Sequence, residues 1–210
     1  IVSYTGTGAN ATIGHGLGVA PSMIIFKNRS DAEGWKVYHT GIGATKNLNL
    51  DENAAAQTQS GAFNDTAPTS SVFSVGTFNS TNGSGDNMIA YCFAEKKGYS
   101  KFGSYTGNGN ANGPFVYTGF KPAFIMFRRT DTTGDWVMKD NKRSGTAALQ
   151  NFGQVNPNQT QHPSANQTNA ENKASALAMD ILSNGFKPRG TDTDINASNG
   201  NYIYMAFAEQ

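Results

Sequence analysis

The sequence has 210 residues, which suits one large domain or two small ones. Its 16 Lys and Arg residues balance 15 Asp and Glu residues, so no charge excess would draw it to nucleic acid or to an anionic membrane. The single cysteine, Cys92, excludes an intrachain disulfide, and no apolar run approaches the roughly 20 residues that cross a bilayer. Twenty-four glycines among many Asn, Ser and Thr residues predict short strands joined by polar turns.

Apolar segments predict strands along the first half of the chain. A Gly- and Asn-rich stretch over residues 6–18 holds a short strand, and stronger strands follow it. They are SMIIFKN (22–28), WKVYH (35–39), LNLDEN (48–53), SVFSVG (71–76) and NMIAYCFAE (87–95). Turns rich in Gly, Asn, Asp and Ser separate these segments, as expected for antiparallel strands.

The second half shows a similar order of elements. Strands are predicted at AFIMFRR (123–129), WVMKD (136–140), DILSNGF (180–186, with a turn) and NYIYMAFAE (201–209). ENKASALAMDIL (171–182) instead suggests a helical turn. The remainder of residues 141–180 is polar and predicts no regular element.

An internal repeat explains this similarity. Shifting the sequence by 101 positions brings SYTG at 3–6 onto SYTG at 104–107, and Trp35 onto Trp136. Further along, Gly76 is expected to match Gly185, and residues 87–95 match 201–209, which requires two insertions in the second copy. The chain begins at Ile1 inside a module, so we expect it to be a piece of a longer protein.

These patterns predict an all-β protein with two tandem antiparallel β-sandwich modules of the jelly-roll-like kind. The first module should span residues 1–97 and the second, with longer loops, residues 98–210. The junction KKGYSK is too short to be a flexible spacer. Both tryptophans are expected in the cores, because large aromatic side chains are usually buried.

No motif indicates enzyme chemistry. GTGANATIGHG lacks the Lys and the helix of a phosphate-binding loop, and the three histidines neither recur between the copies nor show metal-ligand spacing. No paired carboxylates or Ser-His-Asp context is evident. We therefore expect no catalytic residue, no cofactor and no metal.

Two acidic and amide-rich segments, at 79–87 and 191–201, precede the closing strand of each module. Their oxygen side chains could hold Ca²⁺, but hairpin turns explain them equally well, and turns are the preferred interpretation.

Six blocks of the sequence together resemble a repeat of bacteriophage virion proteins. The blocks are ANATIGHGLGVAPSMIIFKNRS, GWKVYH, NDTAPTSSVFSVG, IAYCFAEKKGYSKFGSYTGNG, GPFVYTGFKPAFIMFRR and GNYIYMAFAE. The repeat is known from tail fibres, tailspikes and structural proteins of phages of marine and cyanobacterial hosts. The resemblance implies a location in the virion tail or another appendage, assembled in the bacterial cytoplasm, and a role in receptor recognition. It supplies no catalytic residues.

The leading hypothesis is thus a non-enzymatic tail-fibre module that adheres to host-surface glycan. Its expected partners are other copies of itself in a homotrimer, neighbouring virion proteins and a host polysaccharide, with no nucleic acid and no membrane insertion. Candidate ligand-binding residues lie where the copies diverge. They are Tyr38, His39, Asp65, Lys139, Asp140, His162 and Asp192. The alternatives are a structural stalk, spacer or capsid-decoration module, a glycan-degrading tailspike fragment, and a secreted carbohydrate-binding module.

Overall fold

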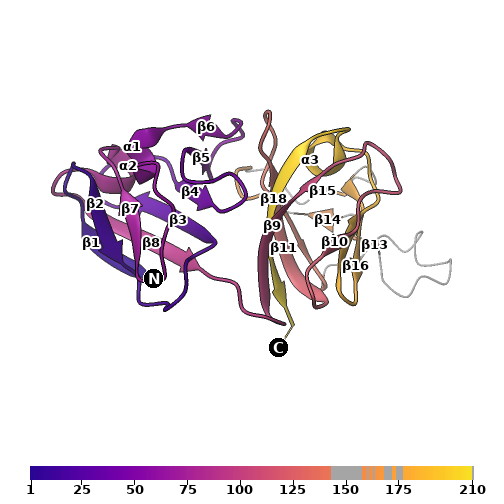
Figure 1. Ribbon diagram of the computed structural model, residues 1–210. Helices are drawn as coiled ribbons and strands as arrows, with labels where there is room; N and C mark the ends of the chain where they lie inside the picture. Colours follow the sequence, from indigo (N-terminus) through magenta and orange to yellow (C-terminus); the bar gives the residue numbers. More distant parts are fainter. Residues whose placement is uncertain (143–157, 160, 163, 168–171, 174–176, 210) are drawn as a thin grey trace. The chain divides into compact units, whose positions relative to one another are not determined.

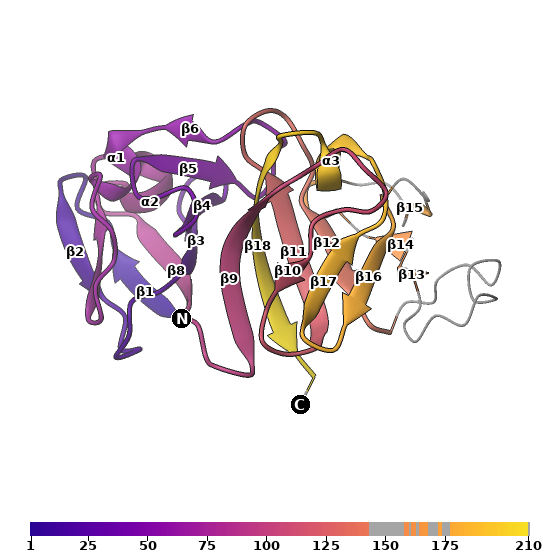
Figure 2. The same ribbon diagram turned by 45° about the vertical axis from the view of Figure 1, so that its right-hand side comes forward.

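The computed structural model shows an antiparallel β-rich chain in two compact units, Ile1–Glu95 and Lys96–Gln210 (Figures 1 and 2). It describes residues 1–142, 158–159, 161–162, 164–167, 172–173 and 177–209. The second unit begins two residues before the module boundary expected from the sequence. Among the described residues, the helices are all too short to span a membrane.

The first unit consists of two antiparallel sheets and two single-turn helices. One sheet has the strand order β1-β8-β3-β4-β5-β6, and the other pairs β2 with β7. The elements are β1 (Val2–Thr5), β2 (Ala11–Gly14), β3 (Met23–Asn28), β4 (Lys36–His39), β5 (Lys46–Asn49), β6 (Gln57–Thr58), α1 (Ser60–Phe63), β7 (Val72–Val75), α2 (Asn79–Asn82) and β8 (Asn87–Phe93).

The core of the first unit lies between its two sheets. Strand β3 alternates so that Ile24 and Phe26 face β7, whose Phe73 meets the Phe26 ring edge-on at 5.4 Å between centroids. Helix α1 closes the layer with Phe63, whose ring also contacts that of Phe26. Burying each of these aromatic rings is worth about 1.5–3 kcal/mol.

The second unit is a two-layer sandwich with a small additional sheet. Its sheets have the orders β12-β11-β18-β9 and β10-β17-β16-β13, and β14 pairs with β15. The elements are β9 (Ser100–Thr106), β10 (Val116–Tyr117), β11 (Pro122–Arg129), β12 (Val137–Asp140), β13 (Asn158–Gln159), β14 (Gln161–His162), β15 (Asn172–Lys173), β16 (Met179–Leu182), β17 (Gly185–Pro188), α3 (Thr193–Asn196) and β18 (Asn201–Ala208). Inward-facing residues of both layers, such as Ile125, Phe127, Ile181 and Phe186, form its core.

Strand order along the chain is similar in the two units. In each, the first and last strands are neighbours, and the long apolar strand pairs with the last strand on one side and with the following strand on the other. Five backbone hydrogen bonds also occur in matching pairs. They are Gly6–Asp86 and Gly107–Gly200, Gly8–Asn82 and Gly109–Asn196, Gly85–Gly6 and Asn199–Gly107, Arg29–Asn87 and Thr130–Asn201, and Thr40–Ser22 and Asn141–Ala123, each with the first-named residue donating N–H.

A buried asparagine in each unit corrects the alignment of the second half. Asn82 donates from Nδ2 to the Gly76 carbonyl at 2.7 Å, and Asn196 donates to the Gly190 carbonyl at 3.1 Å. Gly76 therefore corresponds to Gly190 rather than to Gly185. From Gly76 onward the two halves then match without a gap, because Asn82 and Asn87 fall on Asn196 and Asn201.

Three local expectations need correction. Among the described residues of 171–182 the predicted helical turn is present only at Leu177, and Met179–Leu182 is instead strand β16, whose Met179 and Ile181 alternate into the core. The polar segments at 79–87 and 191–201 form the helical turns α2 and α3 rather than simple hairpin turns. Trp136 is buried as expected, but Trp35 is half-buried and stacks on Tyr91.

Gly6 must lack a side chain because another part of the backbone passes against it. A Cβ at this position would overlap the carbonyl oxygen of Gly83. We expect Gly6→Ala to lower the free energy of unfolding by roughly 1–3 kcal/mol, the usual cost of overpacking. Urea denaturation measures this loss. Gly14→Ala is the matched control, since its nearest neighbouring atom lies at 3.9 Å. Equal stability of both variants would contradict the close approach.

Candidate functional site

Two of the three sequence-predicted ligand residues in the first unit are buried. Tyr38 and His39 lie in strand β4 and are 5% and 1% exposed. The Tyr38 ring packs edge-on against Phe63, and His39 Nδ1 accepts a hydrogen bond from the Gly41 amide at 2.9 Å. Asp65 is exposed, in a left-handed turn with φ of 47°. Strand β4 thus directs Tyr38 into the core rather than toward a ligand.

Tyr38 and Thr66, the residue after Asp65, line one narrow crevice. The other lining residues are Ile24, Phe26, Phe63, Pro68, Phe73 and Ser74. The crevice is too narrow to admit a water molecule. It is therefore a packing defect beneath the 64–70 loop and offers no room for a ligand.

The predicted residues of the second unit also scatter. Lys139 is fully buried in strand β12, opposite Ile125 of β11, and desolvation lowers its pKa to about 7. Asp140, on the same strand, accepts a hydrogen bond from the Lys142 amide at 3.0 Å. His162 lies in strand β14, and its side chain is outside the described residues. Lys139 belongs to the interior and not to a binding surface.

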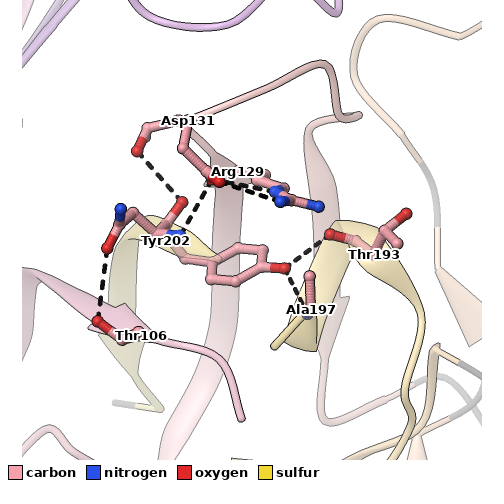
Figure 3. Close-up of polar contacts among 8 residues, drawn as sticks. Thr106, Arg129, Asp131, Thr193, Ala197 and Tyr202 are labelled. Atoms are coloured by element: carbon pink, nitrogen blue, oxygen red, sulfur yellow. Dashed lines mark hydrogen bonds and ion pairs between the residues drawn. The ribbon is translucent and has the colours of Figure 1, made fainter. Parts of the chain in front are cut away.

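Asp192 caps helix α3, within a polar network that holds the loops of the second unit. Its Oδ1 accepts from the Asp194 amide at 2.8 Å. Just beyond it, the Tyr202 hydroxyl donates to the Thr193 carbonyl at 2.6 Å and accepts from the Ala197 amide at 2.8 Å (Figure 3). Burial raises the pKa of Tyr202, so this hydroxyl stays protonated and keeps its donor role at neutral pH.

An ion pair anchors the same loops. Arg129 contacts Asp131 through both Nε and Nη2, each at 3.0 Å, and Asp131 Oδ1 also accepts from the Asn201 amide (Figure 3). The hydrogen bond from Arg129 holds the pKa of Asp131 below its usual value. The bonds of this network hold single turns together, as between Asp192 and Asp194, or tie Asp131 to the start of strand β18 at Asn201. This arrangement explains loop rigidity better than ligand binding.

A surface that the sequence-based candidates missed lies on the second unit. Phe115 and Tyr117 are 47% and 62% exposed, although they flank the buried Val116 of strand β10. Because side chains alternate along a strand, both rings project from the outer face of the β10-β17-β16-β13 sheet. Figure 2 shows strands β10, β17 and β16 of this sheet side by side. We call this surface the Phe115–Tyr117 face.

Gly185 gives the Phe115–Tyr117 face its shape. It lies directly opposite Tyr117 in the pairing of β10 with β17. A Cβ on Gly185 would come within 3.0 Å of the Phe115 ring, so this ring lies across the glycine. The bare backbone at Gly185 therefore leaves the outer surfaces of both rings clear of neighbouring side chains from β17.

Charged side chains border the rings on the same face. Lys187 follows Gly185 by two residues and is half-buried. Arg189 follows Lys187 by two residues. Its Nε contacts Asp180 Oδ2 at 2.5 Å, and its Nη1 lies 3.4 Å from Asn112 Oδ1. A surface with flat apolar rings and a few hydrogen-bonding groups beside them is typical of ligand-binding sites.

The first unit lacks such a surface at the corresponding place. In its β2-β7 sheet the half-buried Ile13 lies opposite the buried Phe73, as Val116 lies opposite Phe186 in the second unit. Thr12 and Gly14 then stand where the second unit has Phe115 and Tyr117. The pattern Phe-Val-Tyr, with aromatic residues on both sides of a core valine, was a usable sequence signal, but only the strand register shows that both rings face outward.

The fold and this face define an antiparallel β-rich protein with an exposed aromatic surface on its second unit. The chain belongs to the family described as a domain of unknown function (DUF7483), whose model matches residues 1–210. No curated protein and no solved structure matches the chain.

Proposed function

We propose that this chain is a non-enzymatic module of a bacteriophage tail fibre and that it attaches the virion to host-surface glycan. The Phe115–Tyr117 face is the single observation that carries the adhesion part of this proposal. The virion part rests on the resemblance of the six sequence blocks. The proposed location is the virion tail or another appendage.

Sugar rings suit the Phe115–Tyr117 face for a physical reason. The C–H surface of a pyranose is apolar and stacks on aromatic rings, whereas its hydroxyl rim needs hydrogen-bonding partners. The two rings supply the first requirement, and Lys187 and Arg189 supply donors for the second. The face is shallow, so each contact would be weak and binding would depend on several copies acting together.

Tandem copies of one module provide that multiplicity in the proposed fibre. We propose that the two units are such copies, each a jelly-roll-like arrangement in which the first and last strands are neighbours. The five matched pairs of backbone hydrogen bonds support this proposal. A homotrimer, together with neighbouring virion proteins, would multiply the sites further and cover exposed sheet edges.

A structural spacer is the second candidate function. The loop network around Asn82, and its counterpart around Asn196, occupies polar side chains that a binding loop would need. A rigid stalk without a ligand would need only such networks. The aromatic rings favour adhesion over this alternative, because a spacer gains nothing from exposing them to water.

The adhesion proposal predicts a loss of cell binding when the two rings are removed. The test uses the fluorescent 210-residue fragment on a trimeric scaffold, with candidate host cells before and after periodate treatment of their glycans. We expect saturable binding that periodate abolishes. The double variant Phe115→Ser/Tyr117→Ser should weaken it by tenfold or more, which corresponds to about 1.4 kcal/mol or more in the binding free energy of the trimeric scaffold.

The matched control is Leu17→Ser/Val19→Ser, which removes two exposed apolar side chains from the first unit. It should leave binding unchanged. Binding that survives the Phe115/Tyr117 double variant would place the ligand elsewhere. Absence of binding by the unaltered fragment on every permissive host would support the spacer instead.

A further inference from the structure

A buried lysine and a buried asparagine face each other in the first unit. Lys36 of β4 and Asn49 of β5 are directly opposite in the antiparallel register. The Lys36 amine donates to Asn49 Oδ1 at 2.6 Å. The two residues are only 7% and 8% exposed. A buried lysine has lost its hydrating water, and here the side-chain amide of Asn49 accepts a hydrogen bond from its amine.

A carboxylate touches the other end of the same amide. Glu52 Oε2 accepts a hydrogen bond from Asn49 Nδ2 at 2.5 Å. The asparagine side chain is therefore held between an amine at its oxygen and a carboxylate at its nitrogen. Both contacts fix the orientation of the amide: the amine touches Oδ1, the oxygen bonded to Cγ, and the carboxylate touches Nδ2.

Burial of Lys36 shifts its amine toward the neutral form. The contact of Nζ with the Phe78 ring, 5.0 Å from the ring centre, acts the other way, because an aromatic face attracts the ammonium. Desolvation lowers the pKa of Lys36, although Glu52, Asp51 and Glu33 act in the opposite direction. A neutral lysine amine is a nucleophile, whereas the ammonium is not.

We propose that Lys36 and Asn49 form an intramolecular isopeptide bond and that Glu52 transfers the proton that this reaction requires. The nitrogen Nζ attacks Cγ of Asn49, and a new Nζ–Cγ amide bond replaces the Cγ–Nδ2 bond. One proton leaves Nζ and one is gained by Nδ2, which departs as ammonia. The reaction is an amide exchange, so it needs no oxidant, reductant or other co-reactant.

Glu52 is placed for the proton transfer because it already contacts the departing nitrogen. It would accept the proton that Nζ loses in the tetrahedral intermediate and deliver it to Nδ2. Confinement of the three groups by the β4–β5 register makes the attack intramolecular, which compensates for the poor reactivity of an amide. The second unit has Val137 where the first has Lys36, so only the first unit would carry the bond.

Mass spectrometry of the purified 210-residue chain tests this proposal. We expect an intact mass about 17 Da below that of the sequence, since ammonia is lost. Trypsin should not cleave after Lys36, and the digest should contain residues 30–46 joined to residues 47–96 through Lys36 and Asn49. Full intact mass after prolonged incubation, with normal cleavage after Lys36, would overturn the proposal.

Two variants separate this bond from other losses of ammonia. Succinimide formation at Asn-Gly sequences also releases ammonia, but it persists in Lys36→Arg, whereas the linked peptide should vanish. Glu52→Gln keeps the hydrogen-bonding shape of its side chain and removes the proton carrier. The Glu52→Gln variant should fold, as judged by circular dichroism. Its linked peptide should form at least tenfold more slowly than in the unaltered chain. Linkage at the unaltered rate in Glu52→Gln would rule out the assigned role of Glu52.

Discussion

Replacing Asn82 by alanine is expected to lower the free energy of unfolding of the first unit by roughly 3–5 kcal/mol. The Asn82 side chain is fully buried and connects three separate segments of the unit. Its Nδ2 donates to the carbonyls of Gly76 and Ala9, both at 2.7 Å. Its Oδ1 accepts from the Thr7 amide at 2.8 Å. Alanine would leave these backbone groups without their partner in a buried place.

The measurement for Asn82→Ala is urea denaturation followed by Trp35 fluorescence, in a Trp136→Phe background that silences the other unit. Asn79→Ala is the matched control, because it makes the same substitution on the same helix at an exposed side chain. A loss below about 1 kcal/mol, equal to that of the control, would show that water or a loop movement satisfies the exposed groups.

Lys139 should make the stability of the second unit depend on alkaline pH. Its pKa falls from the usual 10.5 to about 7 in the folded state because of desolvation. Between these two values the unfolded chain binds more protons than the folded one, so stability rises with pH across this window. Below about pH 7 the lysine is charged in both states and the full cost of burying the charge remains. The total change is on the order of 5 kcal/mol.

The comparison that isolates this effect is between the unaltered chain and Lys139→Met, by urea denaturation at several pH values between 6 and 10.5. Trp136 fluorescence in a Trp35→Phe background reports on the second unit. We expect the unaltered chain to gain stability relative to the variant as pH rises. Lys142→Met, at an exposed lysine, should show no such trend. A parallel pH dependence for the unaltered chain and Lys139→Met would mean that Lys139 is charged inside the fold at neutral pH.

Local sequence patterns predicted the β class because strands depend on short-range features. Alternating apolar residues, as in Ile203 and Met205, and turn-forming Gly and Asn act within a few positions of one another. The segment 171–182 shows the limit of the same reasoning. Ala and Leu favour a helix locally, and Leu177 is in a helical turn, but at Met179–Leu182 the core of the second unit accepts the alternating face of a strand.

The candidate ligand residues were chosen by comparing the two copies, and divergence alone does not separate surface from interior. Tyr38 and Lys139 differ between the copies because each core is packed differently, not because either residue meets a ligand. The Phe115–Tyr117 face needed one more fact, the register that places Tyr117 opposite Gly185. A pairing between strands about 70 residues apart leaves no mark in the local pattern.

The sequence by itself therefore determined the antiparallel β class, the similarity of the two halves and the absence of a disulfide, since each follows from composition, periodicity or a count. Tertiary structure alone decided which polar groups are buried and what they contact. Asn82, Lys36 and Asn49 are ordinary polar residues in the sequence. Their roles arise from long-range pairing, which removes them from water and leaves each with only the partners that the fold provides.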